Sequence, residues 1–112
     1  MPLPTVIIAQ RDQSISQWLA NELDTHFSRV LVADNVAELH TLLLRHQARV
    51  AVLDADILSL EEISQLANSF GDLAIVATHH SPDERMWMEA LEAGAAEFCH
   101  PRDIGSILRA SR

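Results

Sequence analysis

Val50-Ala51-Val52-Leu53-Asp54 joins an unbroken apolar run to a carboxylate that follows it at once. Four consecutive apolar residues, three of them good strand formers, are typical of a strand buried on both faces of a parallel sheet. In open α/β sheets, ligands and chemistry collect where the strands reach their carboxyl ends. The sequence therefore predicts that Asp54 lies at a functional site.

Further apolar runs and helical patterns alternate along the rest of the chain. The additional predicted strands cover residues 5–9, 30–33, 73–77 and 95–99. Apolar residues spaced by three and four predict helices from residue 14 to about 25, over 36–46, 60–70 and 82–93, and from 104 onward. This alternation implies right-handed crossovers and helices on both faces of a parallel sheet, which makes a three-layer, doubly wound α/β domain.

Prolines set two of the expected element boundaries. Pro2 and Pro4 should keep the first residues irregular, because proline supplies no N–H to a strand ladder. Ser81 followed by Pro82 predicts a cap and a first helical residue for the fourth helix. That helix is expected to carry Trp87, Ala90 and Leu91 and to end at Gly94.

The composition narrows the class of protein. The chain has 112 residues, 48% of them hydrophobic, which suits one domain over residues 1–112 with a single core. A formal net charge of −8 argues against binding to nucleic acid. The single cysteine, Cys99, excludes an internal disulfide, and no apolar run reaches membrane length. Because no signal peptide is recognisable either, we expect a cytoplasmic protein.

Glycine-rich nucleotide motifs are absent from the sequence. The only glycines are Gly71, Gly94 and Gly105, so neither a P-loop nor a dinucleotide motif can be written. No Ser/Thr/Gly-rich loop follows the first predicted strand, which disfavours a flavin. No cofactor is therefore expected.

Four segments together resemble the receiver domain of two-component response regulators. The segments are residues 6–9, 50–54, 75–78 and 90–95. The resemblance covers nearly the whole chain and implies a flavodoxin-like (βα)5 fold with the sheet order 2-1-3-4-5. It places Asp54 at the phosphoacceptor position, Thr78 at the hydroxyl residue that contacts the phosphoryl group, and Phe98 at the aromatic switch position.

The pocket that this resemblance implies departs from the receiver pattern. Gln10 and Arg11 stand where family members carry the acids that hold magnesium, a hard cation that needs carboxylate oxygens. Asp12 could serve as a ligand, together with Asp54, only if the loop shifts, so we expect no metal unless that happens. His100 replaces the family's lysine and exchanges a fixed charge for a titratable one.

Arg11 leaves two interpretations open. Its guanidinium could form an ion pair with Asp54 and so mimic a neutralised pocket, although exposed pairs of this kind contribute only about 0–1 kcal/mol. The alternative is an ordinary solvated loop residue.

His79-His80 and Cys99-His100 end two strands that the implied topology makes neighbours. Two imidazoles and a thiolate could therefore converge as ligands of a transition metal. The alternative is that these are loop histidines beside a buried structural thiol.

Met86-Trp87-Met88 form an apolar run within the predicted fourth helix. Consecutive residues cannot all point inward on one helix, so at least one large apolar side chain should be exposed. Receivers use this face for dimers and partners, which makes the three residues candidates for an interface. Ordinary packing is the alternative.

Together these observations favour an atypical receiver, or pseudo-receiver, in two-component or phosphorelay signalling. Phosphoryl transfer to a carboxylate needs cations to offset developing charge, and both the metal ligands and the lysine are changed here. We expect a regulatory domain, not an enzyme, that acts through protein contacts. Candidate partners are an effector domain following residue 112, a histidine kinase or a second copy.

The alternative is a competent receiver in which Asp54 is phosphorylated with rearranged magnesium ligands. A small flavodoxin-like enzyme or a metal-binding protein is a third class.

Overall fold

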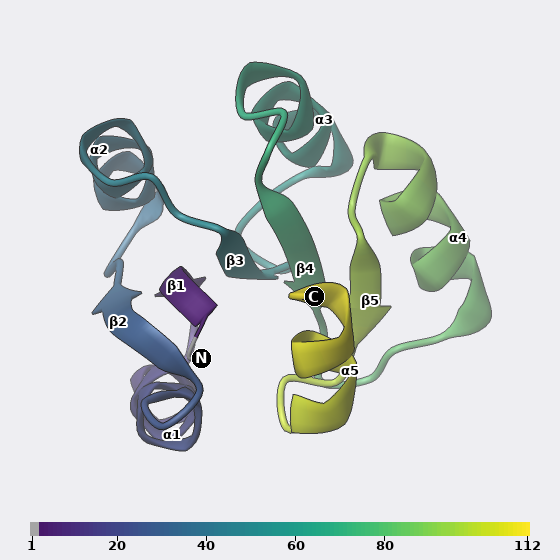
Figure 1. Ribbon diagram of the computed structural model, residues 1–112. Helices are drawn as coiled ribbons and strands as arrows, with labels where there is room; N and C mark the ends of the chain where they lie inside the picture. Colours follow the sequence, from purple (N-terminus) through teal and green to yellow (C-terminus); the bar gives the residue numbers. More distant parts are fainter. Residues whose placement is uncertain (1–2) are drawn as a thin grey trace.

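The computed structural model describes residues 3–112 as five strands alternating with five helices (Figure 1). The elements are β1 (Leu3–Ala9), α1 (Gln13–Leu23), β2 (Phe27–Val32), α2 (Val36–Arg45), β3 (Val50–Asp54), α3 (Leu60–Ser69), β4 (Ala74–Thr78), α4 (Glu84–Ala93), β5 (Glu97–Cys99) and α5 (Ile104–Ala110). All strand pairs are parallel, and the sheet order is β2-β1-β3-β4-β5. The predicted flavodoxin-like α/β fold and strand order are therefore confirmed.

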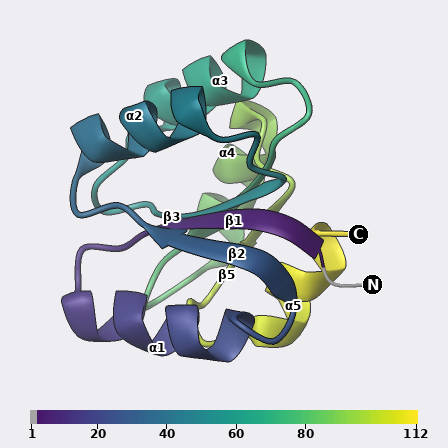
Figure 2. The same cartoon turned by 60° about the vertical axis from the view of Figure 1, so that its left-hand side comes forward.

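The helices cover both faces of the sheet, which gives three layers. α2, α3 and α4 lie on one face, and α1 and α5 lie on the other (Figures 1 and 2). Each face has its own core: Leu39, Ile63 and Phe98 belong to the first, and Leu19 and Ile107 to the second. Burial of one such aliphatic side chain contributes about 1.5–3 kcal/mol, so the two cores hold the helices against the sheet. No helix within residues 3–112 has the length and apolar character needed to cross a membrane.

β3 is the doubly buried strand that its sequence predicts. Residues Val50 to Leu53 are completely inaccessible, because β1 and β4 flank the strand and helices cover both faces. The register pairs Leu53 with Ala9 on β1 and Asp54 with Thr78 on β4. These strands end together, and we call their ends, with the loops that follow, the carboxyl edge. The opposite side of the sheet, where the strands begin, is the amino edge.

Several predicted strand boundaries are wrong, including the start of β5, which is Glu97 and not residue 95. β1 already includes Pro4, whereas Pro2 lies outside the described residues. Pro4 fits in β1 because the register with β2 pairs Leu3 with Phe27 and Thr5 with Arg29 but skips Pro4, which has no N–H to donate. β2 begins at Phe27 because this buried aromatic residue belongs to the second core.

The beginning of α4 also differs from the prediction. Asp83 is the N-cap and accepts the N–H of Met86, so Ser81 and Pro82 lie before the helix. Within the helix, Trp87 is 43% exposed, whereas Met86 packs against the first core.

Gly94 ends α4 at the amino edge. Its φ of 115° is in the left-handed region that favours glycine. A Cβ added there would lie 2.7 Å from the Cβ of Ala67 on α3. Gly94 therefore both terminates α4 and permits the close approach of α3.

Candidate functional site

A cavity of about 450 Å³ opens at the carboxyl edge, and we call it the carboxyl-edge cavity. Its lining comes mainly from the loops that follow β1, β3, β4 and β5. The lining residues are Gln10, Arg11, Asp12, Ile15, Asp54, Asp56, His79, His80, His100, Pro101 and Arg102. Every residue predicted for the pocket except Thr78 is among them, and Thr78 is fully buried beside Gln10.

Asp54 is partly buried, and both of its carboxylate oxygens accept backbone hydrogen bonds. The Arg11 N–H donates to Oδ2 at 2.9 Å, and the Asp56 N–H donates to Oδ1 at 2.9 Å. Hydrogen bonds to a charged acceptor are stronger than neutral ones. The loops after β1 and β3 therefore fix this carboxylate where it lines the cavity.

A buried hydrogen bond joins Gln10 to Thr78 across β3. The Gln10 Nε2 donates to the Thr78 Oγ1 at 2.9 Å, and the Thr78 hydroxyl donates to the Leu53 carbonyl oxygen at 3.3 Å. Gln10 is 5% exposed and Thr78 is fully buried. Buried polar groups of this kind are costly to leave without partners. Gln10 stands at the first position of the acidic pair that a receiver carries, and its amide is bonded to Thr78.

The ion pair between Arg11 and Asp54, one of the two interpretations of Arg11, does not form. Among residues 3–112 the ion pairs involve Asp56 and Glu89 as acids, whereas Arg11 reaches Asp54 only through its backbone N–H. The backbone direction after β1 turns this N–H toward the carboxylate and leaves the residue exposed. The interpretation of Arg11 as a solvated loop residue is the one that the geometry supports.

Asp12 serves as the N-cap of α1. Its Oδ1 accepts both the hydroxyl and the N–H of Ser14 at 2.8 Å, and these two hydrogen bonds lower its pKa. Magnesium needs several hard oxygen ligands in octahedral geometry. With Gln10 bonded to Thr78 and Asp12 bonded to Ser14, the residues present do not fit that requirement.

The loop after β4 meets Asp56, a residue that sequence reasoning did not single out. The His79 Nε2 lies 3.2 Å from Asp56 Oδ1, and the His80 Nδ1 lies 3.7 Å from Asp56 Oδ2. Asp54 and Thr78 are register partners, so the residues just after them meet at the carboxyl edge. That register, combined with the acid two residues after β3 ends, is the signal that could have found Asp56.

Cys99 does not join these histidines. Its side chain is buried in the second core, and burial raises the pKa of the thiol to about 12, with the nearby Asp103 and Glu97 carboxylates adding to the effect. His100 does line the cavity, and its Nδ1 accepts the Arg102 N–H at 3.0 Å. The expected convergence thus brings the imidazoles to one cavity but leaves the thiol out.

The remaining predicted residues do not line this cavity. Phe98 is buried in the first core. On α4, Trp87 is 43% exposed and Met88 is 50% exposed, whereas Met86 is partly buried. The expectation that at least one large apolar side chain of this run is exposed is therefore confirmed.

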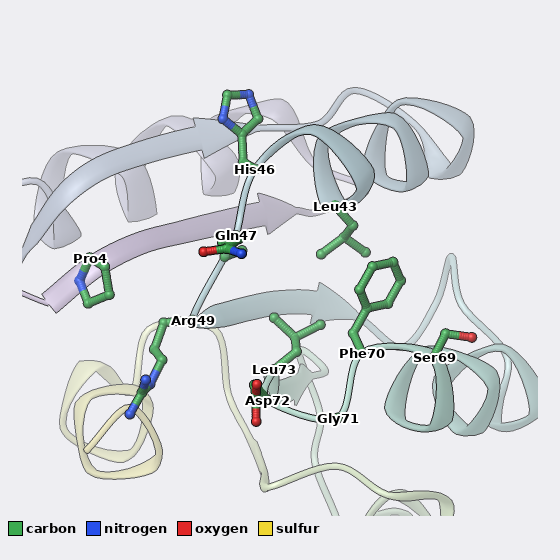
Figure 3. Close-up of a pocket in the computed structure, with 11 residues that line it drawn as sticks. Pro4, Leu43, His46, Gln47, Arg49, Ser69, Phe70, Gly71, Asp72 and Leu73 are labelled. Atoms are coloured by element: carbon green, nitrogen blue, oxygen red, sulfur yellow. The ribbon is translucent and has the colours of Figure 1, made fainter.

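A second cavity, of about 490 Å³, opens at the amino edge (Figure 3). The carbon side chains of Leu43, Phe70 and Leu73 line it together with the more polar His46 and Asp72. Within residues 3–112, no side-chain hydrogen bond or ion pair joins two of its lining residues. We call it the amino-edge cavity, and its residues form no polar constellation comparable to the one around Asp54.

The comparisons with known proteins bear on the fold. A scan against protein-family models finds no match, and a search of curated proteins finds none either. Solved structures do match. One is the N-terminal signal receiver domain of a two-component response regulator from Bacteroides fragilis, with a TM-score of 0.86 at 23% identity over 98% of each chain.

Two further structures are similar to this chain. A response regulator from Thermotoga maritima matches with a TM-score of 0.81 at 23% identity, over 88% of this chain and 84% of that one. A response regulator from Burkholderia pseudomallei, solved with a phosphorylated aspartic acid, a calcium ion and citrate, matches with a TM-score of 0.84 at 19% identity, over 97% and 66%. The chain has the fold of response regulator receiver domains.

Proposed function

We propose that this chain is a receiver-type regulatory domain of two-component signalling in which magnesium-dependent phosphorylation of Asp54 is impaired. Its role is regulatory and not enzymatic. The receiver fold and the carboxylate at the end of β3 support the signalling role. The observation that carries the impairment is the buried hydrogen bond from Gln10 to Thr78.

The physical reason lies in the charge that phosphoryl transfer develops. Negative charge on the transferring oxygens has to be offset by cations or by aimed hydrogen-bond donors. Here Gln10 offers a neutral amide that is bonded to the Thr78 hydroxyl, so neither group is free for a phosphoryl oxygen. Asp12 is occupied by Ser14.

The competing candidate is a receiver that still accepts phosphate at Asp54. The position of Asp54 favours it, because the carboxylate lines the cavity beside two backbone N–H donors. The similar Burkholderia pseudomallei structure carries a phosphorylated aspartic acid. Phosphorylation here would require Asp12 to leave its cap, or water to replace the missing ligands.

Reaction with a small phosphodonor separates these two candidates. We would incubate the chain with acetyl phosphate and magnesium and measure its intact mass. The unmodified chain is expected to gain no phosphoryl group, because the magnesium ligands are missing. The Gln10→Asp, Arg11→Asp double variant restores two acids and is expected to gain one.

Two controls keep the experiment interpretable. Adding Asp54→Asn to the double variant should abolish the mass increase, which places the phosphoryl group on Asp54. Arg11→Ala, which removes the guanidinium without adding an acid, should stay unmodified. Phosphorylation of the unmodified chain at Asp54 would contradict the impairment and establish the competing candidate.

We further propose that α4 provides the surface for protein contacts. Trp87 and Met88 are large apolar side chains that remain about half exposed there, and aromatic and Met residues are enriched at interfaces. A second copy of the chain is the simplest partner to test. Sedimentation velocity across a concentration series should show self-association that Trp87→Ala weakens, and a concentration-independent monomer would contradict a homodimer.

A further inference from the structure

Three potential metal ligands meet in the lining of the carboxyl-edge cavity. They are the Asp56 carboxylate and the imidazoles of His79 and His80. Their ligating atoms all lie within 4.8 Å of one another. Two of the separations, 3.2 Å from Asp56 to His79 and 3.7 Å from Asp56 to His80, are close to the spacing of ligands around a single small cation.

The fold holds this cluster in place from several directions. The Asp56 N–H is bonded to Asp54, and the His79 N–H donates to the Cys99 carbonyl oxygen at 3.2 Å. The two imidazole rings stack with their centroids 4.3 Å apart, so both rings are on the same side of the loop as Asp56. Adjacent residues of a regular strand would point to opposite faces. The histidines converge because β4 ends at Thr78, before them.

We propose that Asp56, His79 and His80 bind a divalent transition-metal ion of the zinc class. One carboxylate oxygen and two imidazole nitrogens are the donor set that zinc accepts, with the fourth tetrahedral position left to water. Magnesium, which prefers oxygen ligands in octahedral geometry, would bind this set poorly. The three ligands do not include Asp54, so the proposed metal site does not depend on whether Asp54 is phosphorylated.

The tautomer of His79 determines what binding would change. Its Nδ1 accepts the N–H of Ser81 at 3.0 Å, so a neutral ring carries its proton on Nε2, the atom that faces Asp56. Zinc needs the lone pair of Nε2. The proton must therefore move to Nδ1, and the Ser81 N–H must turn away from it.

The cost of this rearrangement is small compared with the binding that three ligands provide. Losing one hydrogen bond lowers an association constant by about tenfold, and the coordinate bonds to one carboxylate and two imidazoles oppose that loss. Ser81 is exposed and lies before the Asp83 cap of α4, so its backbone has room to turn. Metal binding would thus be coupled to the loop that leads into the helix carrying Trp87.

The surrounding charges are mixed. Asp54 lines the same cavity and adds negative charge, whereas Arg11 and Arg102 line it from the other loops and oppose a cation. His100 also faces the cavity and engages its Nδ1 with Arg102. The formal net charge of −8 for the whole chain favours the approach of a cation.

Zinc titration of the untagged full chain tests the proposal. We would measure uptake by isothermal titration calorimetry, with excess magnesium present so that a hard-cation site does not contribute. One zinc ion per chain is expected. Asp56→Asn and His80→Ala should each lower the affinity by at least about tenfold. The His80 side chain is 72% exposed, so its removal leaves the core intact.

The matched control is His40→Ala, which removes an exposed histidine of α2 outside the cluster. Its zinc affinity should equal that of the unmodified chain. Uptake well below one ion per chain, or equal affinity in the Asp56→Asn, His80→Ala double variant, would overturn the proposal.

Nitrogen-15 spectra of labelled histidines provide a second readout. In the metal-free chain His79 should show the Nε2–H tautomer, and saturation with zinc should convert it to the Nδ1–H tautomer. Retention of the Nε2–H tautomer at saturation would exclude His79 as a ligand. Because no phosphodonor is involved, the result is independent of the acetyl phosphate experiment.

Discussion

The two edges of the sheet carry cavities of nearly equal size and very different chemistry. The amino-edge cavity has about 490 Å³ and the carboxyl-edge cavity about 450 Å³. Within residues 3–112, two lining side chains make a polar contact with each other only in the carboxyl-edge cavity, where Asp56 meets His79, whereas His46 of the amino-edge cavity contacts Arg29 outside it. Cavity volume therefore says little about where function lies, and buried or bridging polar contacts say more.

The difference follows from the direction of the strands. In a parallel βα sheet every helix begins at the carboxyl edge, so the helix N-termini and their free N–H groups gather there. All five N-caps are polar side chains of this edge: Asp12, Asn35, Ser59, Asp83 and Asp103. At the amino edge the helices end, and the chain returns through short turns such as the one that contains Gly94.

The largest predicted effect concerns two glycines of the amino edge. Gly94→Ala should destabilise the fold by about 2–4 kcal/mol, because a non-glycine residue is strained at φ 115° and its Cβ would meet Ala67. Gly71→Ala should be nearly neutral, since a Cβ there meets nothing within 4 Å. Urea unfolding of both variants checks the pair. Equal losses would mean that the amino-edge cavity is itself tightly packed.

A prediction of intermediate size compares the loss of stability when a polar side chain is replaced at each edge. Thr78→Val keeps the shape of the side chain but leaves the Gln10 amide without its closest partner, which should cost about 1–3 kcal/mol. Ser69→Ala, at an exposed position of the amino-edge cavity, should change stability by less than about 0.5 kcal/mol. Chemical denaturation of the two variants gives the comparison. A loss at Ser69 as large as that at Thr78 would remove the distinction between the edges.

The smallest predicted effect appears at low pH. Hydrogen bonds from the hydroxyl and N–H of Ser106 lower the pKa of Asp103, the N-cap of α5. A carboxylate with a lowered folded-state pKa stabilises the fold above its unfolded pKa, and this contribution is lost as the pH falls through the folded value. The unmodified chain should therefore lose stability as the pH drops below about 4.

Asp103→Asn keeps a capping oxygen but cannot titrate, so its stability should fall less over the same pH range. The difference should stay below about 1 kcal/mol, because the site is exposed and solvent screens it. Asp72→Asn at the amino edge is the control, since Asp72 caps no helix. Thermal unfolding from pH 6 downward measures both variants. An identical pH dependence for Asp103→Asn and the unmodified chain would contradict the prediction.

Much of the fold could be predicted from the sequence, because β3 has an unambiguous pattern. Its apolar run required burial on both faces, and the structure buries it on both. Boundaries were less predictable because they depend on neighbours. Pro4 is tolerated in β1 because the pairing with β2 skips it, and the helix α4 begins at the Asp83 cap although Ser81 offers another.

The candidate site shows the same division between local and tertiary information. The residues predicted for the pocket, except the buried Thr78, do line one cavity, because they lie at or just after strand ends of the carboxyl edge. The residue types alone did not predict which of these side chains contact one another. Charge suggested an ion pair for Arg11, yet the backbone supplies the contact, and Asp56 was overlooked because its partners come from another loop.

The contact between residue 11 and Asp54 has a consequence for how this chain tolerates substitution. Since the donor is the peptide N–H, nineteen of the twenty standard amino acids can supply it, and only proline cannot. The side chain of residue 11 therefore plays no part in the hydrogen bond to Asp54. Most substitutions at position 11 should therefore preserve this hydrogen bond. At position 10 very few should be tolerated, because the side-chain amide of Gln10 is bonded to the buried Thr78 hydroxyl.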